Sequence, residues 1–177
     1  MPSWAGQFRD EEFSEFFRAW RRPLVGYLIV SGCPAHEADD IAQESFLAVR
    51  GRWDHVRGLD QPKAYLFKVA LRRLARARKR QPLEVLSGQE SVEHLAAFPD
   101  PADAIGVSEE QADLMAMIRQ LPVRQRQVFF LRVGLDFSEA ETAQILMISI
   151  GTVKSQLHEA KKKLAELARK SRGDDTR

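Results

Sequence analysis

Apolar residues recur at helical spacing along most of the chain, and the alternating pattern that builds strands does not occur. This periodicity predicts an all-α protein. Proline at 62 and 122 fits the first turn of a helix, and glycine at 134 fits a helix end. The predicted helices cover about 11–30, 35–50, 62–80, 108–120, 122–133, 138–146 and 150–170.

The helical pattern stops between residues 81 and 107, where prolines and glycines stand among isolated acids. A connection of roughly 25 residues without periodicity is longer than the connections inside compact domains. We therefore expect two small helical domains, 8–80 and 108–170, held apart by a flexible acidic linker over 81–107.

Charge is distributed unevenly, although the formal net charge is only +2. Residues 1–80 carry 15 basic and 10 acidic side chains. Residues 81–118 carry eight acidic side chains and no basic one, and residues 119–177 carry 12 basic and seven acidic side chains. Two basic blocks flanking an acidic segment indicate two modules that each meet a polyanion. The chain is 44% hydrophobic, which is typical of a globular protein.

Residues 138–165 have the pattern of a helix-turn-helix. Ser138 and Glu141 form a capping box that opens a short helix, and apolar residues then repeat along one face of a second helix. An amphipathic hairpin with a solvated face would show the same periodicity. If the second helix is a recognition helix, its polar face can reach base edges and phosphates. The candidate DNA-binding residues are Ser149, Thr152, Lys154, Ser155, Gln156, His158, Lys161 and Lys162.

The predicted helix 62–80 separates an apolar face from a basic one. Residues 68–80 contain seven basic side chains and no acid, a crowding that is unfavourable unless a polyanion neutralises it. A solvated cationic helix is the alternative. An aromatic residue ahead of a row of cations favours single-stranded or opening DNA. The candidate DNA-binding residues of this helix are Tyr65, Lys68, Arg72, Arg73, Arg76 and Lys79.

The predicted helix 35–50 carries an acidic, amide-bearing surface. Ile41 and Leu47 are expected to face inward, and Phe46 could face either inward or toward a partner. A cationic partner helix could pair with this surface, although the same carboxylates could simply keep a surface helix soluble. The candidate partner-binding residues are Asp39, Asp40, Gln43, Glu44 and Phe46.

Three segments resemble the sigma factors of bacterial RNA polymerase. GTVKSQLHEAKKKL resembles the recognition helix of their promoter-binding C-terminal domain, LPVRQRQVFFLRVGLDFSEAETAQIL resembles the helices before it, and EADDIAQESFLAVRGRW resembles their polymerase-docking helix. The resemblance covers about 9–80 and 110–168 and is to the extracytoplasmic-function (ECF) type, the smallest of that family.

The resemblance implies a protein that binds core RNA polymerase, recognises promoter DNA and promotes transcription initiation without catalysis. The implied contacts are the clamp helices of the largest polymerase subunit, the flap of the second-largest subunit, and the minus-ten and minus-thirty-five promoter elements. An anti-sigma factor is a further partner that the resemblance allows. The acidic linker could mimic RNA in a basic polymerase channel or be ordinary disordered chain.

Residues 53–61 match the family loop that captures an everted promoter base. Here the resemblance adds Arg57, Asp60 and Lys63 as DNA-binding candidates, with Trp53 and Tyr65 as stacking groups. Trp53 could equally be a core residue. In the helix-turn-helix, Met147 stands where glycine is common, and a non-glycine residue at positive φ costs about 1 kcal/mol. Gln156 and Glu159 stand where arginines are frequent, so we expect weaker phosphate contact and a different base preference.

Other function classes find little support in the sequence. A single cysteine, Cys33, excludes an internal disulfide, and with His36 it forms at most half of a metal site. Neither a phosphate-binding loop nor a nucleophile and base at motif spacing indicates an enzyme, and no cofactor is expected. With no signal peptide or membrane span, we expect a cytoplasmic protein. A LuxR-like transcriptional regulator, with the same helix-turn-helix, is the rival hypothesis.

Overall fold

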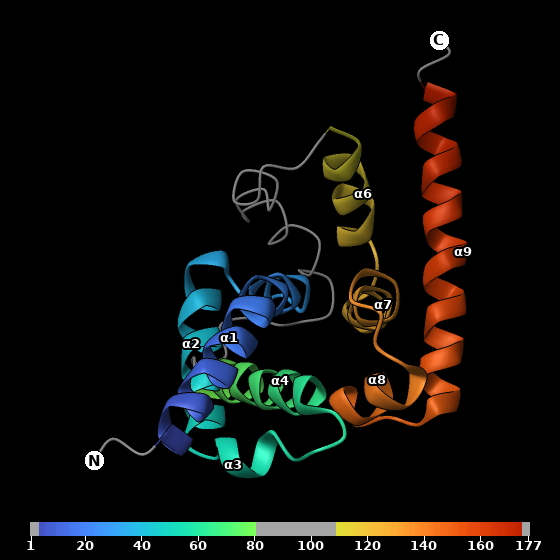
Figure 1. Cartoon of the computed structure of the whole chain (residues 1–177). Helices are drawn as coiled ribbons and strands as arrows, with labels where there is room; N and C mark the ends of the chain where they lie inside the picture. The colour runs from blue at the N-terminus through green and yellow to red at the C-terminus, as the bar shows by residue number, and fades with distance from the viewer. Residues whose placement is uncertain (1–3, 81–108, 175–177) are drawn as a thin grey trace.

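The computed structural model describes residues 4–80 and 109–174, all of whose regular elements are helices. The first range forms the N-terminal domain (Figure 1). A 27-residue helix, α1 (Trp4–Val30), packs along α2 (Ala35–Arg50), and a single-turn helix, α3 (Trp53–Val56), leads into the basic helix α4 (Pro62–Arg80). The acidic linker lies outside the described residues.

The C-terminal domain follows in the second range. It consists of α6 (Glu109–Arg119), α7 (Val123–Phe129), the π-helical turn η2 (Phe130–Gly134), α8 (Glu139–Leu146) and α9 (Ile150–Asp174). The long helix α9 stands at the edge of the molecule, and α6, α7 and α8 all pack against it (Figure 1). Ile118 and Leu121 contribute to a small core with Ala160 and Leu164 of α9.

The all-helical prediction is confirmed, and the bounds of α2 and α4 fall where the periodicity placed them. One helix, α3, escaped notice because four residues are too few to show a period. The predicted helix 122–133 ends early as an α-helix. Its chain continues into η2, where the Leu135 N–H donates to the Phe130 carbonyl at 3.0 Å.

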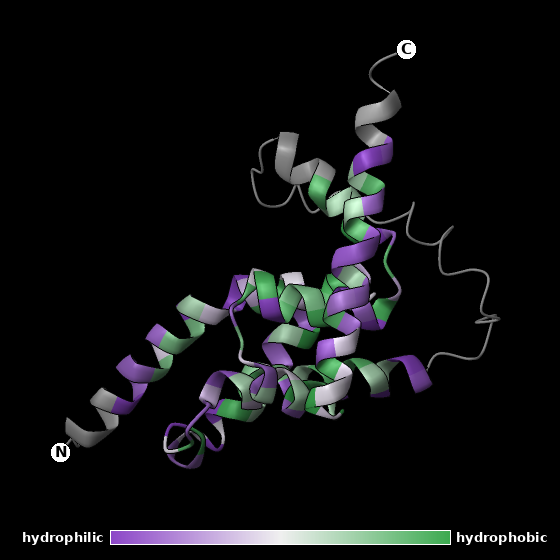
Figure 2. Ribbon diagram, turned by 90° about the vertical axis from the view of Figure 1, so that its right-hand side faces the viewer, coloured by the Kyte–Doolittle hydropathy of each residue, from purple (hydrophilic) through white to green (hydrophobic). Residues whose placement is uncertain are grey.

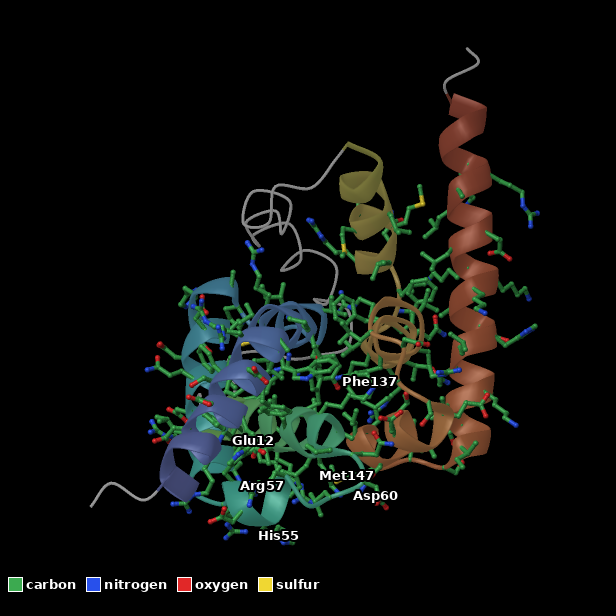
Figure 3. All side chains as sticks on the ribbon, in the orientation of Figure 1. Glu12, His55, Arg57, Asp60, Phe137 and Met147 are labelled. Carbon is green, nitrogen blue, oxygen red and sulfur yellow. The ribbon has the colours of Figure 1, made fainter. Side chains whose placement is uncertain are left out.

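This π-helical ending sets the position of Phe137. The Phe137 N–H donates to the Leu131 carbonyl, and the Arg132 guanidinium donates to the Phe137 carbonyl, so the loop folds back on η2. Asp136 between them adopts φ 51°, a left-handed conformation that aspartate tolerates better than most residues. The result is that the Phe137 ring leaves the C-terminal domain and points toward the N-terminal one (Figure 3).

One hydrophobic core runs through both domains, and this differs from the expectation that the linker holds them apart. Phe137 is fully buried, 5.0 Å from the ring of Phe67 and 6.0 Å from that of Trp20. Tyr27 of α1 lies 6.5 Å from Phe130 of η2. Hydrophobic residues gather where these helices meet, whereas hydrophilic positions line the outer side of α9 (Figure 2). Linker composition gives no information about this contact, which depends on surface complementarity.

Candidate nucleic-acid and polymerase interfaces

The helix-turn-helix is built as its sequence indicates. Ser138 Oγ accepts from the Glu141 N–H, and the Glu141 carboxylate accepts from the Ser138 N–H, which completes the capping box at the start of α8. Met147 ends α8 in the left-handed conformation, with φ 54° and ψ 48°. Ser149 then caps α9 by accepting the Thr152 N–H at 3.0 Å. The turn therefore keeps the glycine-type geometry despite its methionine.

One face of α9 is free for a partner. Val153 and Ala160 are fully buried and anchor the opposite face. The hydroxyl groups of Ser149 and Thr152 form a hydrogen bond at 2.8 Å. The Lys154 ammonium group lies 3.5 Å from the Glu139 carboxylate of the same domain. The candidate residues Ser149, Lys154, Ser155, His158, Lys161 and Lys162 are exposed, whereas Thr152 and Gln156 are half-buried.

The acidic surface of α2 is present, but two expectations about its apolar residues were wrong. Phe46 is only 2% exposed and packs 4.8 Å from Phe17, so it belongs to the core and is not available to a partner in this structure. Leu47 is 59% exposed, contrary to its predicted inward position. The buried stripe Ala38, Ile41, Ala42, Ser45, Phe46 and Val49 has regular i, i+3, i+4 spacing, which could have revealed both.

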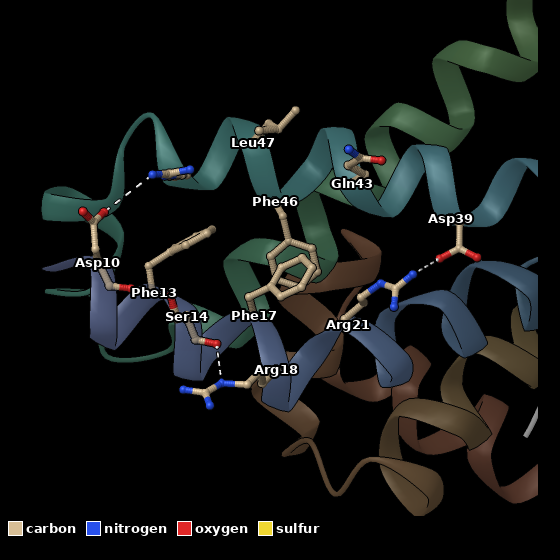
Figure 4. A pocket seen from close by; sticks show the side chains of 11 residues that line it. Asp10, Phe13, Ser14, Phe17, Arg18, Arg21, Asp39, Gln43, Phe46 and Leu47 are labelled. Carbon is tan, nitrogen blue, oxygen red and sulfur yellow. Dashed lines mark hydrogen bonds and ion pairs between the residues drawn. The ribbon is translucent and has the colours of Figure 1, made fainter.

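A groove of about 790 Å³ lies between α1 and α2, beside this acidic surface (Figure 4). Asp39, Gln43 and Leu47 line it from α2. Arg21 of α1 donates to Asp39 at 3.0 Å, and both side chains are more than half exposed. Such exposed pairs contribute little, so a stronger cationic partner can replace Arg21. The groove is lined by apolar side chains together with charges of both signs, the carboxylates Asp10 and Asp39 and the arginines Arg18, Arg21 and Arg50.

The basic face of α4 is only partly free. Arg72, Arg76 and Lys79 are exposed, and Lys68 is half-buried. Arg73 donates to Glu44 of α2 at 2.7 Å and is therefore engaged within its own domain. Arg72, for its part, reaches across to the C-terminal domain, where its guanidinium lies 3.8 Å from the Met147 sulfur.

The cations of α4 also line a space between the domains. This groove, of about 630 Å³, lies between α4, α7 and α8. Its cationic lining residues are Arg72, Arg76, Arg78 and Arg124, and none of the described residues that line it is a carboxylate.

The candidate DNA-binding residues in and beside the loop before α4 differ in how far they are exposed. Trp53 is 9% exposed and lies 5.2 Å from Phe13 and 5.1 Å from Phe16, so its ring is part of the core. Arg57 donates to Glu12 at 2.9 Å on the surface, and Asp60 is exposed (Figure 3). Tyr65 is half-buried against the core. In this structure neither aromatic residue presents a free ring, and only the polar part of the loop is accessible.

Lys63 lies between the two domains, with part of its side chain exposed. Its ammonium group lies 3.5 Å from the Glu141 carboxylate, 4.6 Å from the centre of the Phe137 ring and 5.6 Å from that of Trp20. Burial raises the pKa of Glu141, but hydrogen bonds from the Ser138 backbone and side chain, and then Lys63, outweigh it and leave the pKa lowered. Glu141 is therefore ionised at neutral pH. No short-range sequence pattern pairs Lys63 with a residue 78 positions away.

Neither a metal centre nor a reactive thiol emerges from the described residues. Residues 4–80 and 109–174 contain no cluster of three or more potential metal ligands. Cys33 is buried, and burial followed by the Glu37 carboxylate raises the pKa of its thiol to about 11, with Arg78 opposing. The thiol thus stays protonated. Across the same two ranges, every helix is too short or too polar to cross a bilayer.

The fold and these surfaces define a two-domain helical protein with a DNA-binding helix-turn-helix. Residues 16–82 match the family model of sigma-70 region 2, and residues 111–164 match that of sigma-70 region 4. The RNA polymerase sigma-E factor of Streptomyces avermitilis is 33% identical over 88% of this chain and 84% of its own length. The ECF RNA polymerase sigma factor RpoE of Cereibacter sphaeroides is 28% identical over 89% of this chain and 87% of its own length.

The fold is shared with a solved structure, the sigma factor RpoE from Bartonella quintana in complex with the anti-sigma factor NepR. The TM-score is 0.67 at 23% identity, over 90% of this chain and 98% of that one. The chain belongs to the sigma-70 family, as a small ECF sigma factor. It is an RNA polymerase sigma factor for promoter recognition and transcription initiation. The region 2 match decides against a stand-alone LuxR-like regulator.

Proposed function

We propose that this sigma factor divides its tasks among three surfaces. The rim of the α1–α2 groove docks on the clamp helices of the largest polymerase subunit. The loop before α4 and the basic face of α4 engage the minus-ten element as it opens, and the exposed face of α9 engages the minus-thirty-five element. The flap of the second-largest subunit contacts the C-terminal domain, and an anti-sigma factor like that in the Bartonella quintana complex competes for these surfaces.

The observation that carries the docking proposal is the arrangement of α2. Asp39, Asp40, Gln43 and Glu44 are all exposed, and Leu47 lies beside them with 59% of its surface in solvent. An exposed apolar residue bordered by carboxylates suits a helix with a cationic rim and an apolar centre.

Promoter melting in this proposal needs no enzymatic activity. Unstacking a base costs a few kcal/mol, and capture of the unpaired base and its phosphates offsets that cost. In this proposal Arg57 and Asp60 of the loop and Lys63 at the start of α4 contact such a base, and the other α4 cations follow the DNA backbone. The protein acts in the cytoplasm, where core polymerase and promoter DNA are available.

Asp39→Arg combined with Asp40→Arg tests the docking surface. We expect the double variant to lose about 100-fold in affinity for core polymerase, since each replacement turns attraction into like-charge repulsion. Fluorescence anisotropy of labelled protein titrated with core enzyme measures this. Glu11→Arg with Glu15→Arg is the matched control, because these acids are exposed on α1 outside the groove. Unchanged core affinity in the Asp39 and Asp40 variant would refute the docking assignment.

A further inference from the structure

Four arginines from two helices meet in the groove between α4, α7 and α8. Arg72, Arg76 and Arg78 come from α4, and Arg124 comes from α7. Within residues 4–80 and 109–174, no carboxylate lies within ion-pair distance of any of the four. Their positive charges are therefore not neutralised by the described part of the chain.

Neutral groups of the protein hold two of these guanidinium groups in place. Arg78 donates one hydrogen bond to the Ser31 carbonyl at 2.7 Å. Arg124 donates one to the side-chain oxygen of Gln127 at 3.4 Å, and Gln127 is only 5% exposed. A guanidinium group has five N–H donors in a rigid fork, so each arginine keeps donors for a ligand.

A fifth arginine adds to the positive potential beside the groove. Arg126 of α7 is only 4% exposed, and it donates to the Arg119 carbonyl at 3.1 Å. Burial first, and then the charge of Arg78, lower the pKa of Arg126. Like charges that crowd together without acidic partners repel one another, and a bound anion would relieve that repulsion.

The size and the apolar part of the groove limit which anion fits. Its volume is about 630 Å³, which lies within the range of about 300 to 1,000 Å³ that is typical of small-molecule sites. Leu71, Val123, Leu146 and Met147 line it alongside the arginines. Met147 lies where α8 ends beside α4 (Figure 3). A DNA duplex is too wide for this space, and inorganic phosphate would leave the apolar side chains without a contact.

We propose that this groove binds a nucleoside diphosphate or triphosphate. The phosphate chain lies between the α4 arginines and Arg124, because a guanidinium fork forms paired hydrogen bonds with phosphate oxygens. The base packs on the apolar side chains, among them Val123 and Met147. The binding itself does not depend on the proposed promoter contacts. Only the competition with DNA described below rests on the proposed function, through Arg72 and Arg76.

Calorimetric titration of the free, full-length protein with ATP and with GTP tests the site. Polymerase is left out because it binds nucleoside triphosphates as substrates. We expect saturable binding of one nucleotide per chain. Inorganic tripolyphosphate should bind about tenfold more weakly, because it has no base to cover the apolar side chains. Equal affinity for tripolyphosphate would contradict the nucleotide assignment.

Arg124→Ala removes the one groove arginine that α7 contributes. We expect nucleotide affinity to fall about tenfold or more, because charge-assisted hydrogen bonds to phosphate are lost. Arg124→Lys should fall between this variant and the wild type, since it keeps the charge but not the fork. Arg124 is exposed, so the fold should persist, and circular dichroism checks this.

Arg22→Ala is the matched control, because Arg22 is an exposed arginine of α1 that does not line the groove. It should leave nucleotide affinity unchanged. Unchanged affinity in Arg124→Ala would overturn the site. An equal loss in Arg22→Ala would do the same, because it would show that the nucleotide responds only to the overall charge of the protein.

Competition with DNA gives a second readout. Nucleotide should weaken the binding of single-stranded minus-ten DNA to the free protein, because both ligands need Arg72 and Arg76. Arg124→Ala should reduce this competition and leave DNA affinity nearly unchanged. If Arg124→Ala lowers the affinities for DNA and nucleotide equally, the groove belongs to the DNA path and the nucleotide site is wrong. Run-off transcription tests the proposed function separately, because its failure would leave nucleotide binding by the free protein unchanged.

Discussion

The two surfaces that we propose for DNA binding, on α4 and α9, are built alike but differ in how far they are covered. Each is a helix with an apolar face buried and a polar face turned outward. On α9 the polar face is exposed, and Lys154 pairs with Glu139 of its own domain. On α4 the face is partly covered, because Lys63 and Arg72 reach the other domain. The comparison teaches that exposure of a charged helix depends on which domain lies beside it.

The largest effect should come from the partly covered surface. Arg72→Ala with Arg76→Ala removes two phosphate contacts where DNA must be held open, and we expect run-off transcription to fall about 100-fold. In a plot of the logarithm of the promoter-binding constant against the logarithm of salt concentration, the slope should become shallower by nearly two. Core affinity should stay unchanged. Full transcription in this variant would end the assignment of α4 to DNA.

The open surface should give a smaller and more selective effect. Lys154→Ala with Gln156→Ala removes one phosphate contact and one candidate base contact, each worth about 1 to 3 kcal/mol. We expect roughly tenfold weaker binding of the polymerase complex to its best promoter, with altered ranking across a promoter library. Equal losses on every promoter would show that neither residue reads sequence.

Acid should weaken the capping box between Ser138 and Glu141 and, to a smaller extent, the Lys63–Glu141 pair between the domains. Because the pKa of Glu141 is lowered, its contribution is present at neutral pH and is lost as pH falls through that lowered pKa. We expect Glu141→Gln to cost about 1 to 2 kcal/mol of unfolding free energy at pH 7. The difference from wild type should shrink toward zero in strong acid. Urea unfolding at a series of pH values measures this, and a constant difference would contradict it.

Met147→Gly should have the smallest effect. Glycine relieves about 1 kcal/mol at the left-handed φ of 54°, but it also removes the contact with Arg72. We expect the melting temperature to rise by about 2 to 4 °C. A fall in melting temperature would mean that the methionine side chain stabilises more than its backbone conformation costs.

Sequence patterns predicted the parts of the fold that depend on neighbours along the chain. Capping at Ser138 and the bounds of α2 and α4 follow from local spacing and were confirmed. The π-helical turn was not foreseen, because it depends on how the loop to Phe137 packs. Leu47 was wrongly expected to face inward and Phe46 was wrongly assigned to the partner surface, because the spacing of the buried stripe on α2 was not followed.

The sequence predicted which residue types form the candidate surfaces, but it did not predict whether those surfaces are exposed or covered. The residue types on α4 and α9 are visible in the sequence, since cations at helical spacing form one face. Whether such a face is free depends on contacts between residues far apart, as with Lys63 and Glu141. Trp53 shows the same limit, because an aromatic residue in a loop gives no sign of whether its ring will pack inward.

The burial of Phe137 between domains of a single chain also has a consequence for how strong that contact needs to be. Two sites joined by a tether see each other at an effective concentration on the order of millimolar. An association that would be too weak to detect between separate molecules can then dominate within one polypeptide. A competitor that binds either face with micromolar affinity can still displace the contact between the domains. The contact can therefore be formed in most molecules and yet be broken readily.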